Sequence, residues 1–439
     1  VPPPGDPGGG GGEMNGKSSR TLLLRGHIID SMSLPRLLDL VMDMGGAFDI
    51  QELRVGQHKT DHSTCRIAVS ADDPAVLDQI LRQATILGAV AIEEEPAQTA
   101  RVELAGVYPE GFYSSSNLAT ELLFDGEWIP VERQEMDCAV ALDRSARRAW
   151  TLPFYETEPG MEVVVGHAGV RVTPLERSRQ TEIFSFMASE VSAEKPKKLL
   201  IAKVAEEMRA TRAEDRMILV VSGPAVVHTG AGEHLSRLIE LGYIQVLFAG
   251  NALAVHDVEA ALFGTALGVN LESGLPTEHG HAHHMRAINR VRAAGGLRPM
   301  VKSGQLQTGV MKSVIDHDVE YVLGGSVRDD GPLPDVCSDM WMAQRRMREA
   351  IWGPGGSGPV TDRPERVTRP RVGLALMLST MLHSIATGNM LPASVRTICV
   401  DINQSVVTKL ADRGSWQSIG LVTDVESFLR ELVLALERQ

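Results

Sequence analysis

Short apolar runs without polar alternation recur in the second half of the chain, and each ends in small or polar residues. The clearest are Met217–Val221, Ile244–Ala249, Glu320–Leu323 and Thr397–Val400. Since strands covered by helices on both faces need no polar side, such runs predict a parallel sheet. With the helical segments between them, they predict a doubly wound, Rossmann-like α/β domain over residues 216–439. Ligands bind such sheets at the carboxyl ends of the strands.

The first half of the chain is predicted to hold two smaller units. Residues 20–98 follow the order strand-helix-strand-strand-helix-strand of a ferredoxin-like α/β unit. Residues 99–175 carry short strand-like runs separated by glycine and proline, which indicate a small β-rich domain. Charged segments with helical periodicity over residues 176–215 indicate connecting helices. The Pro/Gly-rich residues 1–19 predict a disordered tail.

One uncharged stretch, Val372–Val395, resembles a membrane span at first sight. Polar residues such as Ser379, His383 and Asn389 interrupt it, whereas a span needs about 20 predominantly apolar residues. We therefore predict a buried helix that ends in a polar loop, and no contact with membranes. The preceding segment Gly353–Arg371, rich in Gly, Pro and charge, is predicted to be an exposed insertion loop.

Charge and cysteine content narrow the class of protein. The net charge of -13 argues against nucleic-acid binding, which needs clustered Lys and Arg. No CxxC pair occurs among the cysteines, so neither a disulfide framework nor a zinc site is expected and a cytoplasmic location is favoured. The four cysteines are Cys65, Cys138, Cys337 and Cys399.

Two strand ends are candidates for nucleotide binding. Ser222-Gly223-Pro224 leads toward a helix and could cradle a phosphate on backbone N–H groups, although a tight turn explains it equally well. Asp401 follows the run Thr397–Val400, where a carboxylate can accept hydrogen bonds from a ribose diol. It would also repel the 2′-phosphate of NADP, which favours NAD as the cofactor. A capping role for Asp401 at the next helix remains an alternative.

Four histidines stand close together at His279, His281, His283 and His284. His279 and His283 would share one face of a helix that began at His279, a spacing that suits a metal. No cysteine or carboxylate cluster completes such a site, so we predict no metal. Histidines that contact substrate or take part in catalysis are favoured, with surface histidines as the alternative.

An acidic loop, Asp329-Asp330 with Asp335, follows the run Glu320–Leu323. Carboxylates at a strand end can hold ammonium groups or accept protons. A solvated turn is the alternative, because Asp-Gly-Pro is ordinary turn composition. Lys302 would be a candidate base if burial lowered its pKa, and a surface lysine otherwise.

Four stretches carry a family resemblance: Gly223–Gly232, Phe248–Asp257, Arg328–Asp335 and Thr387–Asn403. They resemble the archaeal-type ornithine cyclodeaminases, a module that also follows an arginine dihydrolase domain in some cyanobacterial proteins. The family's N-terminal part is named for similarity to lysine-ketoglutarate reductase/saccharopine dehydrogenase proteins. Its C-terminal domain resembles the NAD-binding fold of deoxyhypusine synthase. The arginine dihydrolase domain has no counterpart here, so arginine hydrolysis is not expected.

The resemblance implies conversion of L-ornithine to L-proline and ammonia with a recycled NAD, by a homo-oligomer (dimer or tetramer). A saccharopine-type dehydrogenase or a nucleotide- or amino-acid-sensing regulator is the alternative. The catalytic candidates under this interpretation are Asp330, Asp335, Lys302 and His283. The implied NAD contacts are Asn251, Ala252, Asp330, Thr387, Gly388, Asn389, Met390, Asp401, Asp424 and Val425.

Overall fold

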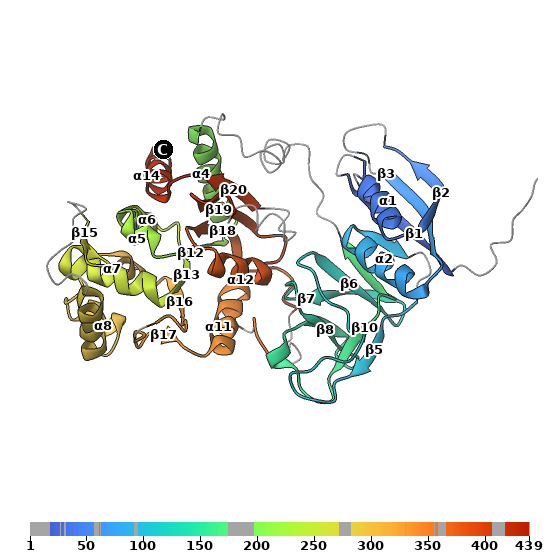
Figure 1. The fold of residues 1–439 in the computed structure, drawn as a ribbon, viewed down its shortest axis with the longest axis horizontal. Coiled ribbons are helices and arrows are strands. Elements are labelled where there is room, and N and C mark those ends of the chain that lie inside the picture. The colour runs from blue at the N-terminus through green and yellow to red at the C-terminus, as the bar shows by residue number, and fades with distance from the viewer. Residues whose placement is uncertain are drawn as a thin grey trace, which may run out of the picture. The chain divides into compact units, whose positions relative to one another are not determined.

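The computed structural model forms two compact units; Figure 1 shows the chain coloured by residue number. One is drawn from Val1–Gln98, Thr120–Trp128 and Gly166–Arg179, and the other from Thr99–Ala119, Ile129–Val165 and Gln180–Gln439. The region predicted as one β-rich domain therefore contributes to both units. The structure describes residues 18–26, 28–29, 32–56, 61, 63–91, 95–173, 197–271, 282–329, 331–354, 356–358, 366–405 and 418–438.

The first unit has the ferredoxin-like architecture that its sequence pattern predicts. Its antiparallel sheet has the order β2-β3-β1-β4, with two helices between the strands along the chain. Asp73 begins the second helix by accepting a hydrogen bond from the Ala75 N–H at 2.9 Å. The elements are β1 (Ser18–Gly26), α1 (Ser33–Asp43), β2 (Ala47–Arg54), β3 (Ser63–Ala71), α2 (Pro74–Ile86) and β4 (Ala89–Ala91), with β6 (Ala119–Phe124) and β11 (Val170–Thr173).

Part of the second unit is a β-rich layer whose strands are neighbours in the order β7-β9-β8-β10-β5. A buried ion pair crosses it, in which Arg148 binds both carboxylate oxygens of Glu132 at 2.7 Å. The elements are β5 (Gln98–Arg101), β7 (Glu127–Glu132), β8 (Ala139–Asp143), β9 (Arg148–Leu152), the 3-10 helix η1 (Phe154–Glu156) and β10 (Glu162–Val165).

The rest of the second unit is the predicted doubly wound domain. Its strands are all parallel and have the order β17-β16-β13-β12-β18-β19-β20, side by side in Figure 1. Without the short edge strand β17, this is the 3-2-1-4-5-6 order of dinucleotide-binding folds. The strands are β12 (Met217–Ser222), β13 (Val246–Gly250), β16 (Glu320–Gly324), β17 (Val336–Cys337), β18 (Val372–Leu378), β19 (Arg396–Asp401) and β20 (Ser418–Val422).

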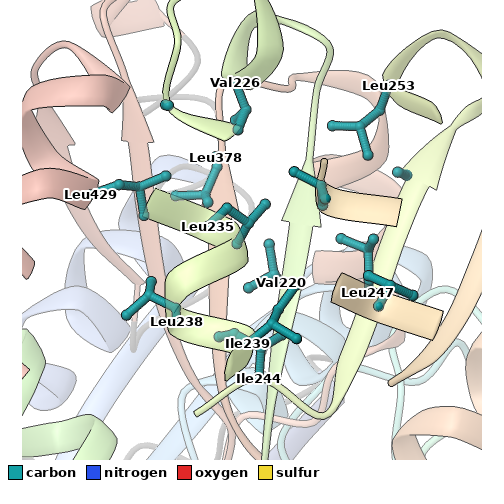
Figure 2. Close-up of a cluster of buried hydrophobic side chains, with 14 of the residues drawn as sticks. Val220, Val226, Leu235, Leu238, Ile239, Ile244, Leu247, Leu253, Leu378 and Leu429 are labelled. Atoms are coloured by element: carbon teal, nitrogen blue, oxygen red, sulfur yellow. The ribbon is translucent and has the colours of Figure 1, made fainter. Parts of the chain in front are cut away.

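Helices cover both faces of this sheet, which explains why its strands carry no polar alternation. Val220 of β12 packs with Leu235 of α6 and Leu429 of α14 on one face (Figure 2), whereas Leu219 and Val221 join a second core under α11 and α12. The helices are α4 (Lys197–Ala213), α5 (Ala225–His228), α6 (Gly232–Glu240), α7 (Asn251–Phe263), α8 (His283–Ala294), α9 (Leu297–Lys302), α10 (Val310–Asp316), α11 (Met340–Trp352), α12 (Leu382–Met390) and α14 (Val425–Glu437).

The prediction of one buried helix over Val372–Val395 is wrong. Residues Val372–Leu378 form β18, and the chain then turns at Ser379, whose φ is 49°, before α12 begins. All seven residues of β18 are buried because it is a central strand. An apolar run of this kind cannot be told from a buried helix by periodicity alone. Among the described residues, no helix is long and apolar enough to cross a membrane.

Candidate active site

The sheet reverses its winding between β12 and β18, which are adjacent parallel strands. From β12 the chain proceeds through β13 to β16, whereas from β18 it proceeds to β19 and β20 on the other side. The connections therefore diverge above the carboxyl ends of this strand pair. Such a topological switch point is where open α/β sheets bind their ligands.

At this point Gly223 lies directly against the turn that follows β18. A Cβ atom on Gly223 would overlap the Ser379 carbonyl oxygen and lie 3.1 Å from Thr380 Cβ. The Gly223 N–H donates to the Leu378 carbonyl oxygen at 3.0 Å. The sequence Ser222-Gly223-Pro224 is therefore a turn that lets the ends of β12 and β18 approach closely, as the structural alternative for this motif predicted.

We predict that Gly223→Ala destabilises the protein by about 1–3 kcal/mol, because backbone must move to admit the methyl group. Gly232→Ala is the matched control, since a Cβ there meets only Val310 Cγ2 at an ordinary 3.5 Å. Urea unfolding monitored by tryptophan fluorescence measures both. Equal stability of the two variants would contradict this account of the switch point.

His383, a residue that no motif singled out, lies across the ends of the neighbouring strands. A Cβ on Gly250, at the end of β13, would lie 3.1 Å from His383 Cε1, and one on Gly324, at the end of β16, 3.8 Å from Nε2. Its Nδ1 is 3.4 Å from Thr380 Oγ1. Burial lowers the pKa of His383, and the nearby Asp329 carboxylate partly opposes this shift. The ring is therefore neutral at pH 7.

Asn251 connects the end of β13 to the acidic loop. Its side-chain oxygen accepts a hydrogen bond from the Leu333 N–H at 3.1 Å, and Ala252 follows it on α7. Asp329 accepts from the Ser326 N–H at 2.9 Å, which makes a local turn. Asp330 lies outside the described residues. The structure therefore brings Asn251, Asp329 and His383 to one edge of the sheet.

The four residues Thr387, Gly388, Asn389 and Met390 belong to α12 and not to a loop. Thr387 and Gly388 are buried, and the Thr387 hydroxyl has no hydrogen-bond partner among the described residues. The Asn389 amide donates to Asp137 at 3.2 Å, and Met390 packs in the core beneath α11 and α12. Of the four, Thr387 is the one with a buried side-chain polar atom that has no partner among the described residues.

Asp401 and Asp424 end successive strands on the other side of the switch point. Asp401 is 8% exposed and accepts from the Asn403 N–H at 2.8 Å, so it also supports the following turn. Asp424 caps α14 by accepting from the Ser427 N–H at 2.9 Å, and Val425 is buried beside it. The side chain that accepts from the following helix is that of Asn403, from the Ser405 N–H at 2.9 Å, and the remaining lone pairs of Asp401 are compatible with the ribose-binding interpretation.

Asp335 and Lys302 have different surroundings from those expected of catalytic groups. Asp335 accepts from the Leu297 N–H at 2.9 Å, at the start of α9, and from the Tyr321 hydroxyl at 3.1 Å. Its carboxylate is thus already engaged in holding α9 to β16. Lys302 is exposed at the last residue of α9, as the alternative of a surface lysine predicted.

His283 begins α8 and is buried, with Nδ1 2.9 Å from the Thr265 hydroxyl. Its ring stacks on Phe263, the last residue of α7. Since Asn251 is the first residue of that helix, about 18 Å along the helix axis separates Phe263 from the strand end. The structure therefore does not bring His283 to the residues at the switch point.

A fully buried carboxylate, Glu259, lies at the centre of this second polar network. It accepts from the Thr265 hydroxyl at 2.9 Å and lies 2.9 Å from His256 Nδ1. The neighbouring Asp257 caps α10 through the Val310 and Met311 N–H groups at 2.8 Å, and burial raises its pKa to about 6. In the described part of the chain, no group of three or more His, Cys, Asp or Glu side chains is placed to hold a metal ion.

Comparisons with known proteins agree with this architecture. A family model described as the ArgZ-like C-terminal Rossmann fold matches residues 202–432, and the first region of the same C-terminal part matches residues 119–201. A model described as the conserved region of LOR/SDH bifunctional enzymes matches residues 19–118. The three matches follow one another along the chain.

Similar proteins are known from archaea and cyanobacteria. The ornithine cyclodeaminase of Methanopyrus kandleri is 50% identical over 94% of this chain and 96% of its own length. The solved structure of apo ArgZ, a cyanobacterial arginine dihydrolase, matches with a TM-score of 0.81 and 36% identity, covering 96% of this chain and 59% of that protein. AgrE, solved in a ternary complex with ornithine and NAD⁺, matches with a TM-score of 0.50 and 38% identity, covering 96% and 58%.

Proposed function

This chain belongs to the family of archaeal ornithine cyclodeaminases, and we propose on that premise that the carboxyl edge of its parallel sheet binds NAD and L-ornithine. The enzyme converts L-ornithine to L-proline and ammonia. The observation that carries the proposal is the placement of Asn251, Asp401 and Asp424, each at the carboxyl end of a different strand. This is the arrangement expected of a dinucleotide site.

The residues at these strand ends fit a dinucleotide. The Thr387 hydroxyl is buried without a partner among the described residues, and Asp401 presents a carboxylate where a ribose diol would lie. When bound, NAD supplies a hydride acceptor and donor for the α-carbon of the substrate. We assign its binding to Asn251, Ala252, Asp330, Thr387, Gly388, Asn389, Met390, Asp401, Asp424 and Val425.

The reaction also requires two groups that the protein's own side chains must supply. A carboxylate must hold the δ-ammonium of ornithine, and a neutral base must remove a proton from the amine that attacks the α-carbon. We assign the first task to Asp330. We assign the second to His383 in preference to Lys302 and His283, because His383 is neutral and lies at the strand ends.

The activity is tested by incubating the purified protein with labelled L-ornithine and a catalytic amount of NAD⁺. We expect labelled proline and one ammonia per proline by mass analysis, with no net accumulation of NADH. Net NADH formation would instead indicate an amino-acid dehydrogenase of the saccharopine type. Binding of ornithine without any product would indicate a sensor.

We predict that Asp401→Ala weakens NAD binding by roughly 10-fold or more, because two hydrogen bonds to the ribose are lost. Isothermal calorimetry with NAD⁺ measures the affinity. Asp339→Ala is the matched control, since Asp339 only caps α11 by accepting from the Met342 N–H at 3.0 Å. Unchanged NAD affinity in the Asp401 variant would leave this carboxylate with its hydrogen bond to the Asn403 N–H as its only role.

We further propose a cytoplasmic enzyme that acts as a homo-oligomer, a dimer or tetramer. The four cysteines are unpaired in the structure, which suits a reducing compartment. Light scattering of the purified protein measures the oligomeric state, and a monomer of 47.5 kDa would contradict the second part of this proposal.

A further inference from the structure

A segment of the β-rich layer, residues 133–138, lies against the end of α12; it is buried except at Met136 and Asp137. The Met136 N–H donates to the Asn389 carbonyl oxygen at 3.0 Å, and the Asp137 carboxylate accepts from the Asn389 amide. Arg133 and Asp137 have φ values of 53° and 62°, in the left-handed region that non-glycine residues rarely adopt. Backbone strain of this kind is concentrated at functional sites.

Two of the buried arginines around this segment have carboxylate partners. Arg148 donates from Nε and Nη2 to the two oxygens of Glu132, each at 2.7 Å. Arg348 donates from Nε to both oxygens of Glu135 at 2.9 and 2.8 Å. In both pairs the charges neutralise each other, and Arg148 uses two nitrogens on one edge of its guanidinium for bidentate recognition.

Arg133 is the exception. Its side chain is buried, with the residue 3% exposed, yet neither Nε nor Nη2 has a hydrogen-bond partner among the described residues. These are the same two atoms with which Arg148 binds its carboxylate. A buried cation without a partner is strongly unfavourable, so the edge of Arg133 is suited to a carboxylate from outside the chain.

A carboxylate of opposite charge, that of Glu156, lies near Arg133. Glu156, on η1, is 8% exposed, and its Oε1 has no hydrogen-bond partner among the described residues. Burial lowers the pKa of Arg133, while the charges of Glu156 and Glu135 raise it, so these groups interact. Nevertheless, no ion pair joins Arg133 to Glu156 in the described part of the chain. A buried cation and a buried anion thus stand close together without neutralising each other directly.

We propose that Arg133 and Glu156 form a binding site for a free α-amino acid. The guanidinium edge of Arg133 binds the α-carboxylate in bidentate fashion, and the Glu156 carboxylate binds an ammonium group of the same molecule. The choice of L-ornithine as first ligand rests on the proposed function. The recognition of a carboxylate by Arg133 does not depend on the proposed function.

The experiment compares each amino acid with the amine that lacks its carboxylate, by calorimetry on the full chain without NAD. The pairs are L-ornithine with 1,4-diaminobutane and L-lysine with 1,5-diaminopentane. We expect the wild-type protein to prefer the amino acid in a pair by roughly 100-fold, since charge-assisted hydrogen bonds are among the strongest. In Arg133→Leu this preference should disappear. In Glu156→Gln, the affinity for both members of a pair should fall.

Thermal unfolding distinguishes a ligand-binding role of Arg133 from a purely structural role. Without ligand, Arg133→Leu should have a Tm equal to or above that of the wild type, because it removes a buried charge that has no partner. Arg148→Leu is the matched control and should have a lower Tm, since it leaves Glu132 buried and unpaired.

Three results would overturn the proposal: an Arg133→Leu variant that keeps the preference for carboxylate, one whose Tm falls as far as that of Arg148→Leu, or a wild-type protein that binds neither amino acid. Absence of proline formation alone would contradict only the proposed function. In that case a preference for carboxylate that depends on Arg133 would still support this site.

Discussion

Arg348→Leu is expected to destabilise the protein by about 3–5 kcal/mol, the loss typical of breaking a buried ion pair from one side. Arg348 lies on α11 and binds both oxygens of Glu135, and its Nη1 donates to the Tyr155 hydroxyl at 2.5 Å. Without it, the Glu135 carboxylate, which is 3% exposed, loses its principal counter-charge. Urea unfolding measures the change.

The stability of Arg348→Leu should also depend on pH, in a direction that follows from the pKa of Glu135. Burial raises the pKa of Glu135, and the Arg348 charge lowers it. In Arg348→Leu the opposing effect is gone, so the pKa rises further above that of the unfolded chain. Because the folded variant then binds a proton that the unfolded chain releases, its stability should fall as the pH rises. The loss relative to the wild type should be larger at pH 8 than at pH 5.

Two further variants control this result. Arg144→Leu breaks an exposed pair with Glu162 and should cost at most about 1 kcal/mol, because solvent screens such pairs. The double variant Arg348→Leu with Glu135→Leu should recover much of the loss, since neither charge remains buried. A loss below 1 kcal/mol in Arg348→Leu would mean that the pair does not hold the β-rich layer to α11.

His383→Gln is expected to lower kcat for ornithine roughly 100- to 10,000-fold, the usual contribution of a general base. The ring lies over the glycines that end β13 and β16, where the substrate is proposed to bind. Glutamine keeps polarity and similar size but cannot take up a proton at neutral pH. Proline formation at saturating ornithine and NAD⁺ measures kcat.

The pH profile distinguishes a base from a residue that only fills space. Burial lowers the pKa of His383, so the acid limb of kcat in the wild type should lie below pH 6.5 and be absent from the variant. His317→Gln is the matched control, because His317 lies at the end of α10 and interacts with the Ser313 carbonyl oxygen at 3.0 Å. Turnover of His383→Gln within threefold of the wild type would exclude a role as base.

The local pattern was sufficient to predict the parallel sheet, because a strand buried on both faces must be apolar at every position. Met217–Val221 and Thr397–Val400 therefore predicted β12 and β19. The same principle made β18 ambiguous, since seven buried residues in a row suit a helix equally well. Only pairing with β12 and β19 distinguishes the two, and the pairing with β12 joins residues more than 150 positions apart.

The strand ends were predictable from the sequence, but the side chains that meet there were not all predictable. Asp401 and Asn251 could be proposed because each follows an apolar run directly. His383 could not, because its place over Gly250 and Gly324 depends on the turn at Ser379. Its one sequence signal was a histidine within an otherwise uncharged, largely apolar stretch.

The sequence by itself thus determined the class of sheet and its polar edge, since both follow from the order of apolar and polar residues along each strand. The tertiary structure decided which charged groups are buried and which have partners. Arg133, Arg148 and Arg348 look alike in the sequence. The carboxylate partners of Arg148 and Arg348 lie 16 and 213 positions away along the chain, whereas two nitrogen atoms of Arg133 have no partner among the described residues. The burial of a charge is a property of such tertiary contacts rather than of its neighbours along the chain.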